Sequence, residues 1–197
     1  MNKAKLILAS GSPRRKEILE NLHFDFDIMI PDTIEDLSRN LPPGQLAMAL
    51  AREKAVAVRK AVCGSDASKW IAAFDTIVVC GKKVLGKPFD QGAARAMLEQ
   101  LSGRDHDVIT AVALSCPGKP RIVERTVKTR VRFKALSNAE IDFYLGTKEW
   151  IGVAGAYRIQ ERGGFFIKSI FGCYFNVVGL PISAFYDMLC ENKYSFF

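Results

Sequence analysis

The chain has 197 residues, 49% of them hydrophobic and 25% charged, and its 28 Lys and Arg against 21 Asp and Glu give a formal net charge of +7. This composition excludes an intrinsically disordered chain, and no apolar run approaches the roughly 18 residues of a membrane-spanning helix. The positive charge favours an anionic partner and leaves both nucleotide and nucleic acid open.

The expected elements of the first half, in chain order, are a strand over 6–9, a helix over 14–22, a helix from 43 to about 62, a strand over 71–80 and a helix between Asp90 and Gly103. Those of the second half are strands over 108–114 and 122–133, a helix over 141–145 preceded by a capping box of Ser137 and Glu140, strands over 165–170 and 174–178, and a last helix opened by Pro181. Strands and helices alternate early and strands dominate the middle. This order predicts an α/β protein with a mixed sheet.

The N-terminal apolar run LILA is too short for the roughly 7 to 15 residue core of a signal peptide. Five cysteines, without a C-x-x-C pair, are expected to be reduced, buried thiols: Cys63, Cys80, Cys116, Cys173 and Cys190. We therefore expect a cytoplasmic protein with a single domain over residues 1–197. The oligomeric state is left open, with a homodimer as one alternative.

The loop ASGSPRR breaks a local rule of folding. Ser12 can cap the following helix and Pro13 suits its first position, but Arg14 and Arg15 then follow. The helix dipole disfavours cations in the first turn by roughly 0.3–1 kcal/mol each. Free backbone N–H groups, the hydroxyls of Ser10 and Ser12 and two guanidiniums can bind phosphate. A basic surface turn is the alternative.

Two charged residues stand where apolar residues are expected. Lys54 falls on the apolar face of the helix over 43–62, so its amine must reach solvent at the edge or meet a partner. Asp75 interrupts the apolar strand WIAAFDTIVVC, and a carboxylate there is costly unless it is paired, hydrogen-bonded or bound to a cation. An aspartate satisfied by a neighbouring lysine, without a function, is the alternative for this position.

The stretch GKKVLGKP, over 81–88, is close to a phosphate-binding P-loop. Gly81, Gly86 and Lys87 match that motif, but Pro88 stands at the hydroxyl position and removes a backbone donor. The stretch also continues into a hairpin-like turn and does not open a helix. We therefore exclude a Walker motif, while Lys87 can still bind phosphate as a point charge.

Several stretches, taken in order, resemble the Maf (septum formation inhibitor) family of nucleoside triphosphate pyrophosphatases. They are LILASGSPRRKEIL, AREKA, FDTIVVCGKKVLGKPFDQGAARAMLEQLSGRDHDVITAVAL, LSNAEIDFYL, AGAYRIQERGG and NVVGLP. The resemblance implies an elongated, two-lobed α/β fold around a mixed sheet with a central cleft, similar to inosine triphosphate pyrophosphatases. It also implies that a nucleoside triphosphate is hydrolysed to the monophosphate and pyrophosphate with Mg²⁺ or Mn²⁺.

The resemblance implies roles for individual residues. Asp75 matches the family's catalytic acidic residue, the proton acceptor, and Lys54 and Lys87 match its phosphate-binding lysines. Ser10 and Arg14 match the binding loop, and we include Ser12 and Arg15 with them as substrate-binding residues. Asp75, with Glu35 or Asp36, is expected to hold the metal ion. Whether Asp75 binds the metal or takes a proton from water stays open, as does the choice between Glu35 and Asp36.

The choice of substrate is also implied by resemblance. Arg14, Thr76 and Gln160 fall on positions linked to the branch of the family that acts on dTTP and UTP. A pocket closed by Thr76, Tyr157 and Phe74 is expected to admit a pyrimidine ring and crowd a purine. The branch that resembles 7-methyl-GTP pyrophosphatases remains an alternative.

A regulatory or nucleic-acid-binding protein of the septum formation inhibitor type is the second alternative. The basic run KTRVRFK favours it at first sight, but its cations alternate with Thr129, Val131 and Phe133. This alternation predicts a solvated strand face. No aromatic stacking surface or groove-reading helix is evident, so nucleic acid is not the expected partner.

Overall fold

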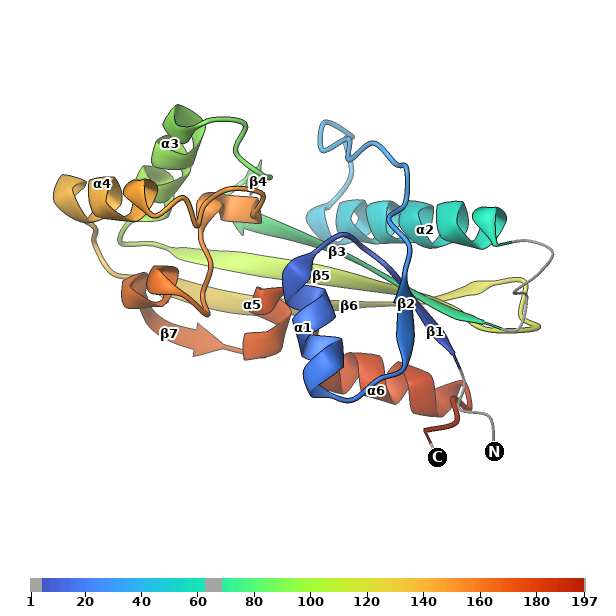
Figure 1. The fold of residues 1–197 in the computed structure, drawn as a ribbon. Coiled ribbons are helices and arrows are strands. Elements are labelled where there is room, and N and C mark those ends of the chain that lie inside the picture. Colours follow the sequence, from blue (N-terminus) through green and yellow to red (C-terminus); the bar gives the residue numbers. More distant parts are fainter. Residues whose placement is uncertain (1–4, 63–68, 197) are drawn as a thin grey trace. The chain divides into compact units, whose positions relative to one another are not determined.

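The structure, a computed structural model, describes residues 5–62 and 69–196 and is built around a seven-stranded mixed sheet (Figure 1). The strands are β1 Leu6–Ala9, β2 Phe26–Ile28, β3 Trp70–Cys80, β4 Lys83–Leu85, β5 Asp105–Ser115, β6 Ile122–Phe133 and β7 Ile167–Phe171. They lie in the order β2-β1-β3-β5-β6-β7, and β4 pairs with β3 outside this row. The expected α/β class with a mixed sheet is confirmed.

The helices connect these strands. They are α1 Pro13–Asn21, α2 Pro43–Ala61, α3 Gln91–Leu101, α4 Asn138–Gly146, α5 Tyr174–Val178 and α6 Ile182–Glu191, with 3₁₀ helices η1 Ala154–Ala156 and η2 Arg162–Phe166. Within the two described stretches, no helix combines the length and the apolar character needed to cross a membrane.

The chain divides into two units, and strands β3, β5 and β6 contribute residues to both. Unit 1 takes the described residues of Met1–Asp75, Thr110–Val127 and Gly179–Phe197, and unit 2 takes Thr76–Ile109 and Lys128–Val178. This division agrees with the two-lobed expectation. The central cleft and the single domain stay predictions.

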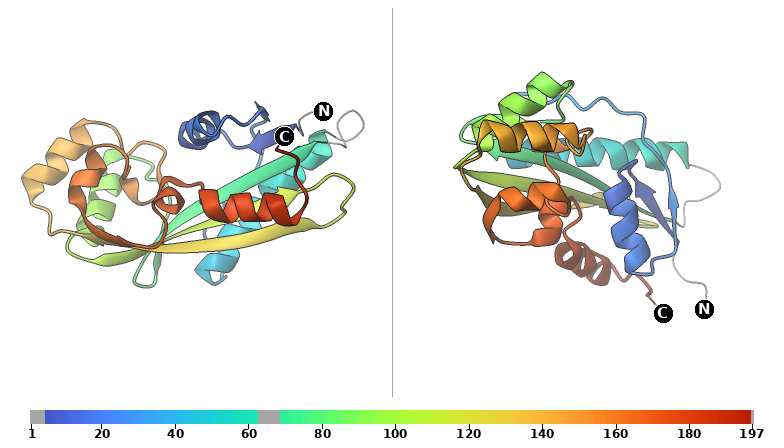
Figure 2. Two further views of the ribbon diagram at one scale, coloured as in Figure 1. Left: turned by 90° about the horizontal axis from the view of Figure 1, so that it is seen from below. Right: turned by 60° about the vertical axis from the view of Figure 1, so that its left-hand side comes forward.

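Unit 1 is built on the parallel strands β2, β1 and β3. Every residue of β1 is buried, and Leu6 pairs with Phe26 on one side and Trp70 on the other. A parallel strand covered on both faces is a continuous apolar run, which is why LILA could be predicted as a strand. Helix α2 covers one face of these strands and α6 the opposite face (Figure 1, Figure 2).

Unit 2 contains α3 and α4 side by side (Figure 1), and Arg95 of α3 pairs with Asp142 of α4. Both helices begin directly after the capping residues that the sequence predicts, and α4 begins three residues before the predicted range of 141–145. Asp90 accepts a hydrogen bond from the first turn of α3 at 2.7 Å, and Ser137 and Glu140 form the expected capping box of α4. Local capping signals therefore fix the starts of these two helices.

The predicted strand over 174–178 is wrong, because these residues form helix α5. A five-residue, mainly apolar run shows no periodicity that separates a strand from a buried helical turn. The turn is anchored by the buried Asn176, whose amide donates to Val108 O and Thr129 Oγ1, each at 3.0 Å. Hydrogen bonds to residues distant in the sequence therefore determine the helical conformation of this segment.

The predicted strand over 165–170 begins only at Ile167, because Arg162–Phe166 is the 3₁₀ helix η2. The backbone there folds closely on itself: a Cβ added at Gly163 would lie 2.5 Å from Arg158 O. The three-residue strands β2 and β4 were not predicted as strands, since they are too short to show alternation.

The expectation of buried cysteines is partly wrong. Cys80 and Cys116 are buried free thiols, but Cys173 is half-buried and Cys190 is exposed. Cys63 lies outside the described residues.

Candidate active site

A charged cluster is the central feature of unit 1. Lys54 Nζ donates to Asp75 Oδ1 at 2.6 Å and to Glu35 Oε1 at 2.7 Å. The side chains of Lys54 and Asp75 are only 9% and 6% exposed. The alternative of a lysine that reaches solvent is therefore wrong, and Asp75 is indeed satisfied by a lysine. Whether that pair also carries a function is a separate question.

The periodicities of a helix and a strand bring this pair together. Lys54 continues the buried stripe of α2 at a spacing of four residues after Leu46 and Leu50. Successive strand residues point to opposite faces, so Phe74 meets Phe185 of α6 at a ring distance of 5.3 Å while Asp75 faces α2. A buried ion pair is often no more stable than an apolar pair of the same size. Stability alone does not explain these charges.

The start of helix α1 suits an anion. Ser12 occupies the N-cap position, but its side chain makes no capping hydrogen bond. The backbone N–H of Ser12 instead donates to Ser10 Oγ at 3.2 Å, and no acidic residue lies in the first turn. Arg14 is half-buried in that turn. Hydroxyl, backbone N–H and guanidinium groups thus gather where the helix dipole favours negative charge.

Arg15 points into unit 1, which the sequence did not reveal. Its Nε donates to Gly179 O at 2.9 Å and its Nη1 donates to Ser10 Oγ at 2.9 Å. Burial lowers the pKa of Arg15, while the negative charges of Asp75 and Glu35 oppose that shift. Arg15 therefore supports the loop at Ser10 and adds positive charge near the two carboxylates. This position argues for a supporting role and against direct exposure to a ligand.

The structure distinguishes the two acidic residues of TIED. Glu35 is the one that reaches Lys54. Asp36 accepts hydrogen bonds from the backbone N–H and the hydroxyl of Ser38, at 2.9 and 2.6 Å, and these bonds lower its pKa. Asp36 thus closes a local turn, and Glu35 is the acidic residue beside Asp75.

The donor set fits a divalent cation only in part. Among the described residues, no group of three or more His, Cys, Asp or Glu side chains is arranged to hold a metal ion. Glu35 and Asp75 provide two carboxylates joined by Lys54. Mg²⁺ is commonly bound by one or two carboxylates together with waters and substrate phosphates. The pair therefore fits a metal whose coordination the substrate would complete.

Lys87 belongs to unit 2 and follows a hairpin. Strands β3 and β4 are antiparallel and are joined by a turn in which Gly81 has φ +61. Lys82, Lys83 and Lys87 are exposed and Pro88 is buried. Because the stretch forms a hairpin and α3 begins only at Gln91, the exclusion of a P-loop is confirmed.

A glycine joins the turn that carries Lys87 to the loop that carries Gln160. Gly155 N–H donates to Gly86 O at 3.1 Å. Gly155 has φ +71, and a Cβ there would lie 2.9 Å from the Val78 side chain, so no other residue fits without rearrangement. Within unit 2, Gln160 is exposed and Thr76 is half-buried.

The expected base pocket is wrong in two of its three residues. Phe74 is 0% exposed and packs in unit 1 against Phe185. Tyr157 is 5% exposed and is held in unit 2 by His106, whose Nε2 lies 2.8 Å from the Tyr157 hydroxyl. Neither ring offers enough surface to select a base by size. Thr76 and Gln160 remain as candidates.

The buried His106 predicts a pH dependence of stability. Desolvation lowers its pKa from 6.5 to about 4, although Asp105 and Asp107 oppose the shift. The unfolded chain therefore binds a proton that the folded chain excludes, and stability falls as pH falls from about 6.5 towards 4. Between pH 7 and pH 5, we expect the free energy of unfolding to drop by about 2 kcal/mol more in the wild type than in His106→Gln. Urea unfolding at both pH values measures this difference, and equal drops would contradict it.

The basic run of β6 is a solvated face, as predicted. Lys128, Arg130 and Arg132 are exposed. Lys128 and Arg130 lie 3.4 and 3.3 Å from Asp107, and Arg132 donates to Asp105 at 2.6 Å. Because these cations already have carboxylate partners, the run does not favour nucleic acid.

Comparisons with known proteins place the chain in a family. Residues 5–192 match the family described as Maf-like protein. The chain belongs to the Maf-like protein family. It is 41% identical over 191 residues to the dTTP/UTP pyrophosphatase of Pelotomaculum thermopropionicum, covering 97% of this chain and 98% of that relative. It is 44% identical over 184 residues to the protein of the same name from Clostridioides difficile, covering 93% of each.

A weak likeness is seen with the structure of the Staphylococcus aureus Ham1 protein, with a TM-score of 0.41, 13% identity and coverage of 66% of this chain and 71% of that one.

Proposed function

We propose that this protein hydrolyses dTTP and UTP to the nucleoside monophosphate and pyrophosphate, acting in the cytoplasm. The observation that carries the proposal is the buried ion pair of Lys54 and Asp75, joined by the more exposed Glu35, beside the start of helix α1 in one unit. Family membership and the names of the relatives at 41% and 44% identity support the same reaction.

Asp75 is the residue to which we assign activation of the attacking water. Lys54 holds the carboxylate through Oδ1, so the second oxygen is the one that we assign to the water. Proton transfer by a positioned carboxylate typically contributes about 100- to 10,000-fold in rate. Glu35 and Asp75 would hold Mg²⁺ or Mn²⁺, which supplies positive charge that stabilises the phosphate oxygens.

Phosphate binding is assigned to a set of cations and to the start of helix α1. A triphosphate carries about four negative charges, and phosphoryl transfer depends mainly on positioning and charge neutralisation. Arg14 and the N–H groups of helix α1 suit a phosphate, and Ser10 and Ser12 add hydroxyls. Lys54 and Lys87 supply point charges. Arg15 supports Ser10 by donating a hydrogen bond to its hydroxyl oxygen.

Base recognition is assigned to Gln160. Its amide has one acceptor oxygen and two N–H donors, so it can accept from the ring N–H of uracil or thymine and donate to a neighbouring carbonyl. Its side chain is exposed within unit 2 and is available to a ligand. Thr76 and Arg14 stay proposals for substrate choice.

A nucleotide panel tests the function. We expect dTTP and UTP to be hydrolysed at least about tenfold more efficiently than ATP or GTP, a difference of about 1.4 kcal/mol at the transition state. Pyrophosphate release measured with each nucleotide and Mg²⁺ or Mn²⁺ gives kcat/KM. Gln160→Ala should erode the preference more than it lowers kcat, whereas Gln91→Ala, an exposed glutamine of α3, should change neither. A preference for GTP or 7-methyl-GTP would contradict the pyrimidine assignment.

A further inference from the structure

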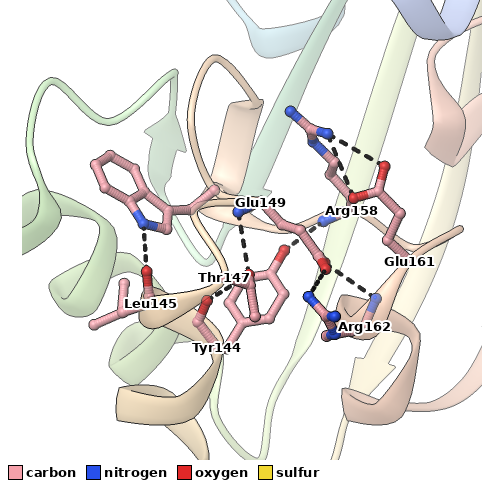
Figure 3. Close-up of polar contacts among 8 residues, drawn as sticks. Tyr144, Leu145, Thr147, Glu149, Arg158, Glu161 and Arg162 are labelled. Carbon is pink, nitrogen blue, oxygen red and sulfur yellow. Dashed lines mark hydrogen bonds and ion pairs between the residues drawn. The ribbon is translucent and has the colours of Figure 1, made fainter.

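Gln160 lies in a turn that is held on both sides by hydrogen bonds to neighbouring side chains. On one side, the backbone N–H of Arg158 donates to the Tyr144 hydroxyl at 3.0 Å (Figure 3). On the other side, the backbone N–H of Arg162 donates to Glu149 Oε2 at 3.0 Å. Both acceptors come from the end of α4 and the segment that follows it. The two captured amides flank Gln160 at the same distance in sequence.

Both acceptors are buried, so removing either one costs free energy that water cannot fully restore. Tyr144 is fully buried, and Glu149 is buried although it is charged. Glu149 Oε1 also lies 3.2 Å from the Arg162 guanidinium, so one carboxylate holds both the backbone and the side chain of Arg162. A buried carboxylate is expensive unless such hydrogen bonds satisfy it. The two donors of Arg162 therefore require a hydrogen-bond acceptor at residue 149.

The backbone before Glu149 is strained in a way that supports this placement. Lys148 has φ +60, a left-handed conformation that a residue with a side chain adopts at a cost. Thr147 Oγ1 accepts from the N–H of Glu149 at 3.1 Å and donates to Tyr144 O at 2.7 Å. Thr147 therefore links Glu149 to Tyr144, and this link does not depend on their contacts with the Gln160 turn.

Gln160, Glu161 and Arg162 are all exposed in this turn, and the last two are held in ion pairs with Arg158 and Glu149. Arg158 pairs with Glu161 at 3.2 Å and donates to Ile151 O at 3.3 Å. Gly163 packs directly against Arg158 O, since a Cβ added at this glycine would lie only 2.5 Å from that oxygen. Gln160 is exposed between these fixed neighbours. A rigid backbone loses little conformational freedom when the side chain that it carries binds a ligand.

We propose that Glu149 and Tyr144 are positioning residues that preset the Gln160 turn for base recognition. This inference rests on the proposed function, because it concerns how the base is selected. Neither residue contacts the reacting phosphates in this account. Their loss should therefore weaken binding of the base while leaving the chemical step and the binding of phosphate intact.

The test compares Glu149→Ala, Glu149→Gln and Tyr144→Phe by KM and kcat for dTTP and ATP and by the Ki of inorganic tripolyphosphate, which has no base. Glu149→Ala and Tyr144→Phe should raise KM for dTTP about tenfold, keep kcat within about twofold and reduce the preference for dTTP over ATP. Glu149→Gln should stay within about threefold of wild type, because its amide oxygen still accepts the N–H of Arg162. The Ki of tripolyphosphate should not change.

A double variant separates positioning from general support. If Glu149 acts through Gln160, adding Glu149→Ala to Gln160→Ala should change KM for dTTP by less than about twofold. Asp142→Asn is the control, because it removes an exposed carboxylate of α4 that pairs with Arg95 of α3. It should keep the wild-type KM, kcat and Ki. If Glu149→Ala does not fold, Tyr144→Phe, which removes only a hydroxyl, decides by the same readouts.

An unchanged KM and base preference in folded Glu149→Ala and Tyr144→Phe would overturn the inference, as would a Ki for tripolyphosphate that rises in step with KM. Multiplicative effects in the double variant would overturn it as well. A selective, active wild type with unaffected variants would overturn only this inference. A wild type that cleaves no nucleoside triphosphate would overturn the proposed function and the inference with it.

Discussion

Replacing Asp75 by asparagine is expected to lower turnover of dTTP by at least about 100-fold without unfolding the protein. Asparagine keeps the shape of the side chain and an oxygen that can accept the hydrogen bond from Lys54 Nζ. Lys54 also keeps Glu35 as a partner, so no buried charge is left alone. The variant removes the negative charge and the basicity of Asp75. Initial rates with dTTP, together with thermal unfolding, measure both parts of this expectation.

A matched control is the same substitution at Asp27. Asp27 lies on strand β2, where its exposed carboxylate is 3.2 Å from Lys69 Nζ. Exposed ion pairs of this kind are worth roughly 0–1 kcal/mol, so Asp27→Asn should retain wild-type turnover and nearly wild-type stability. Near-normal turnover in Asp75→Asn would leave Asp75 as an aspartate satisfied by a lysine and without a catalytic role.

Replacing Lys87 by alanine should lower kcat/KM for dTTP by about 10- to 100-fold, the effect of losing one charged hydrogen bond to phosphate. Lys87 follows the β3–β4 hairpin, and Gly86 beside it is tied to Gly155 by a backbone hydrogen bond. The hairpin carries two further exposed lysines, Lys82 and Lys83, which serve as controls. Steady-state kinetics of the three alanine variants compare them directly. Small, equal effects in all three would remove Lys87 from the site.

Much of the fold follows from local signals in the sequence. The run LILA, the stripe of Leu46, Leu50 and Lys54, and the caps at Asp90 and Ser137 all act over a few residues, and the corresponding elements are found where expected. Helix α5 could not be predicted, because its five residues, four of them apolar, have no distinguishing period. Its conformation depends on hydrogen bonds to residues distant in the sequence.

For the candidate site, the sequence indicated individual residues but not how they pair. Lys54 and Asp75 each broke an apolar pattern, which is how the sequence indicated them, but their pairing depends on α2 lying against β3. The choice of Glu35 over Asp36 did have a local signal. Aspartate followed two residues later by serine favours a local side-chain turn, and Asp36 forms that turn with Ser38.

Other parts of the site had no such signal. The inward direction of Arg15 depends on Gly179 O, which lies far away in the sequence. Strand alternation places Phe74 on the face opposite to Asp75, but its burial depends on packing against Phe185, which is distant in the sequence. The burial of Glu149 follows from contacts with Arg162 across a folded loop. Each of these positions is set by tertiary packing.

The products formed from dTTP by the full-length protein test the central claim most directly. Anion-exchange chromatography or phosphorus NMR of the reaction with Mg²⁺ distinguishes the two bonds that could be cleaved. Cleavage between the α and β phosphates predicts dTMP and pyrophosphate in equal amounts, and Asp75→Asn should lower the rates of formation of both by the same factor. Formation of dTDP and inorganic phosphate, or release of pyrophosphate that persists unchanged in Asp75→Asn, would contradict the account.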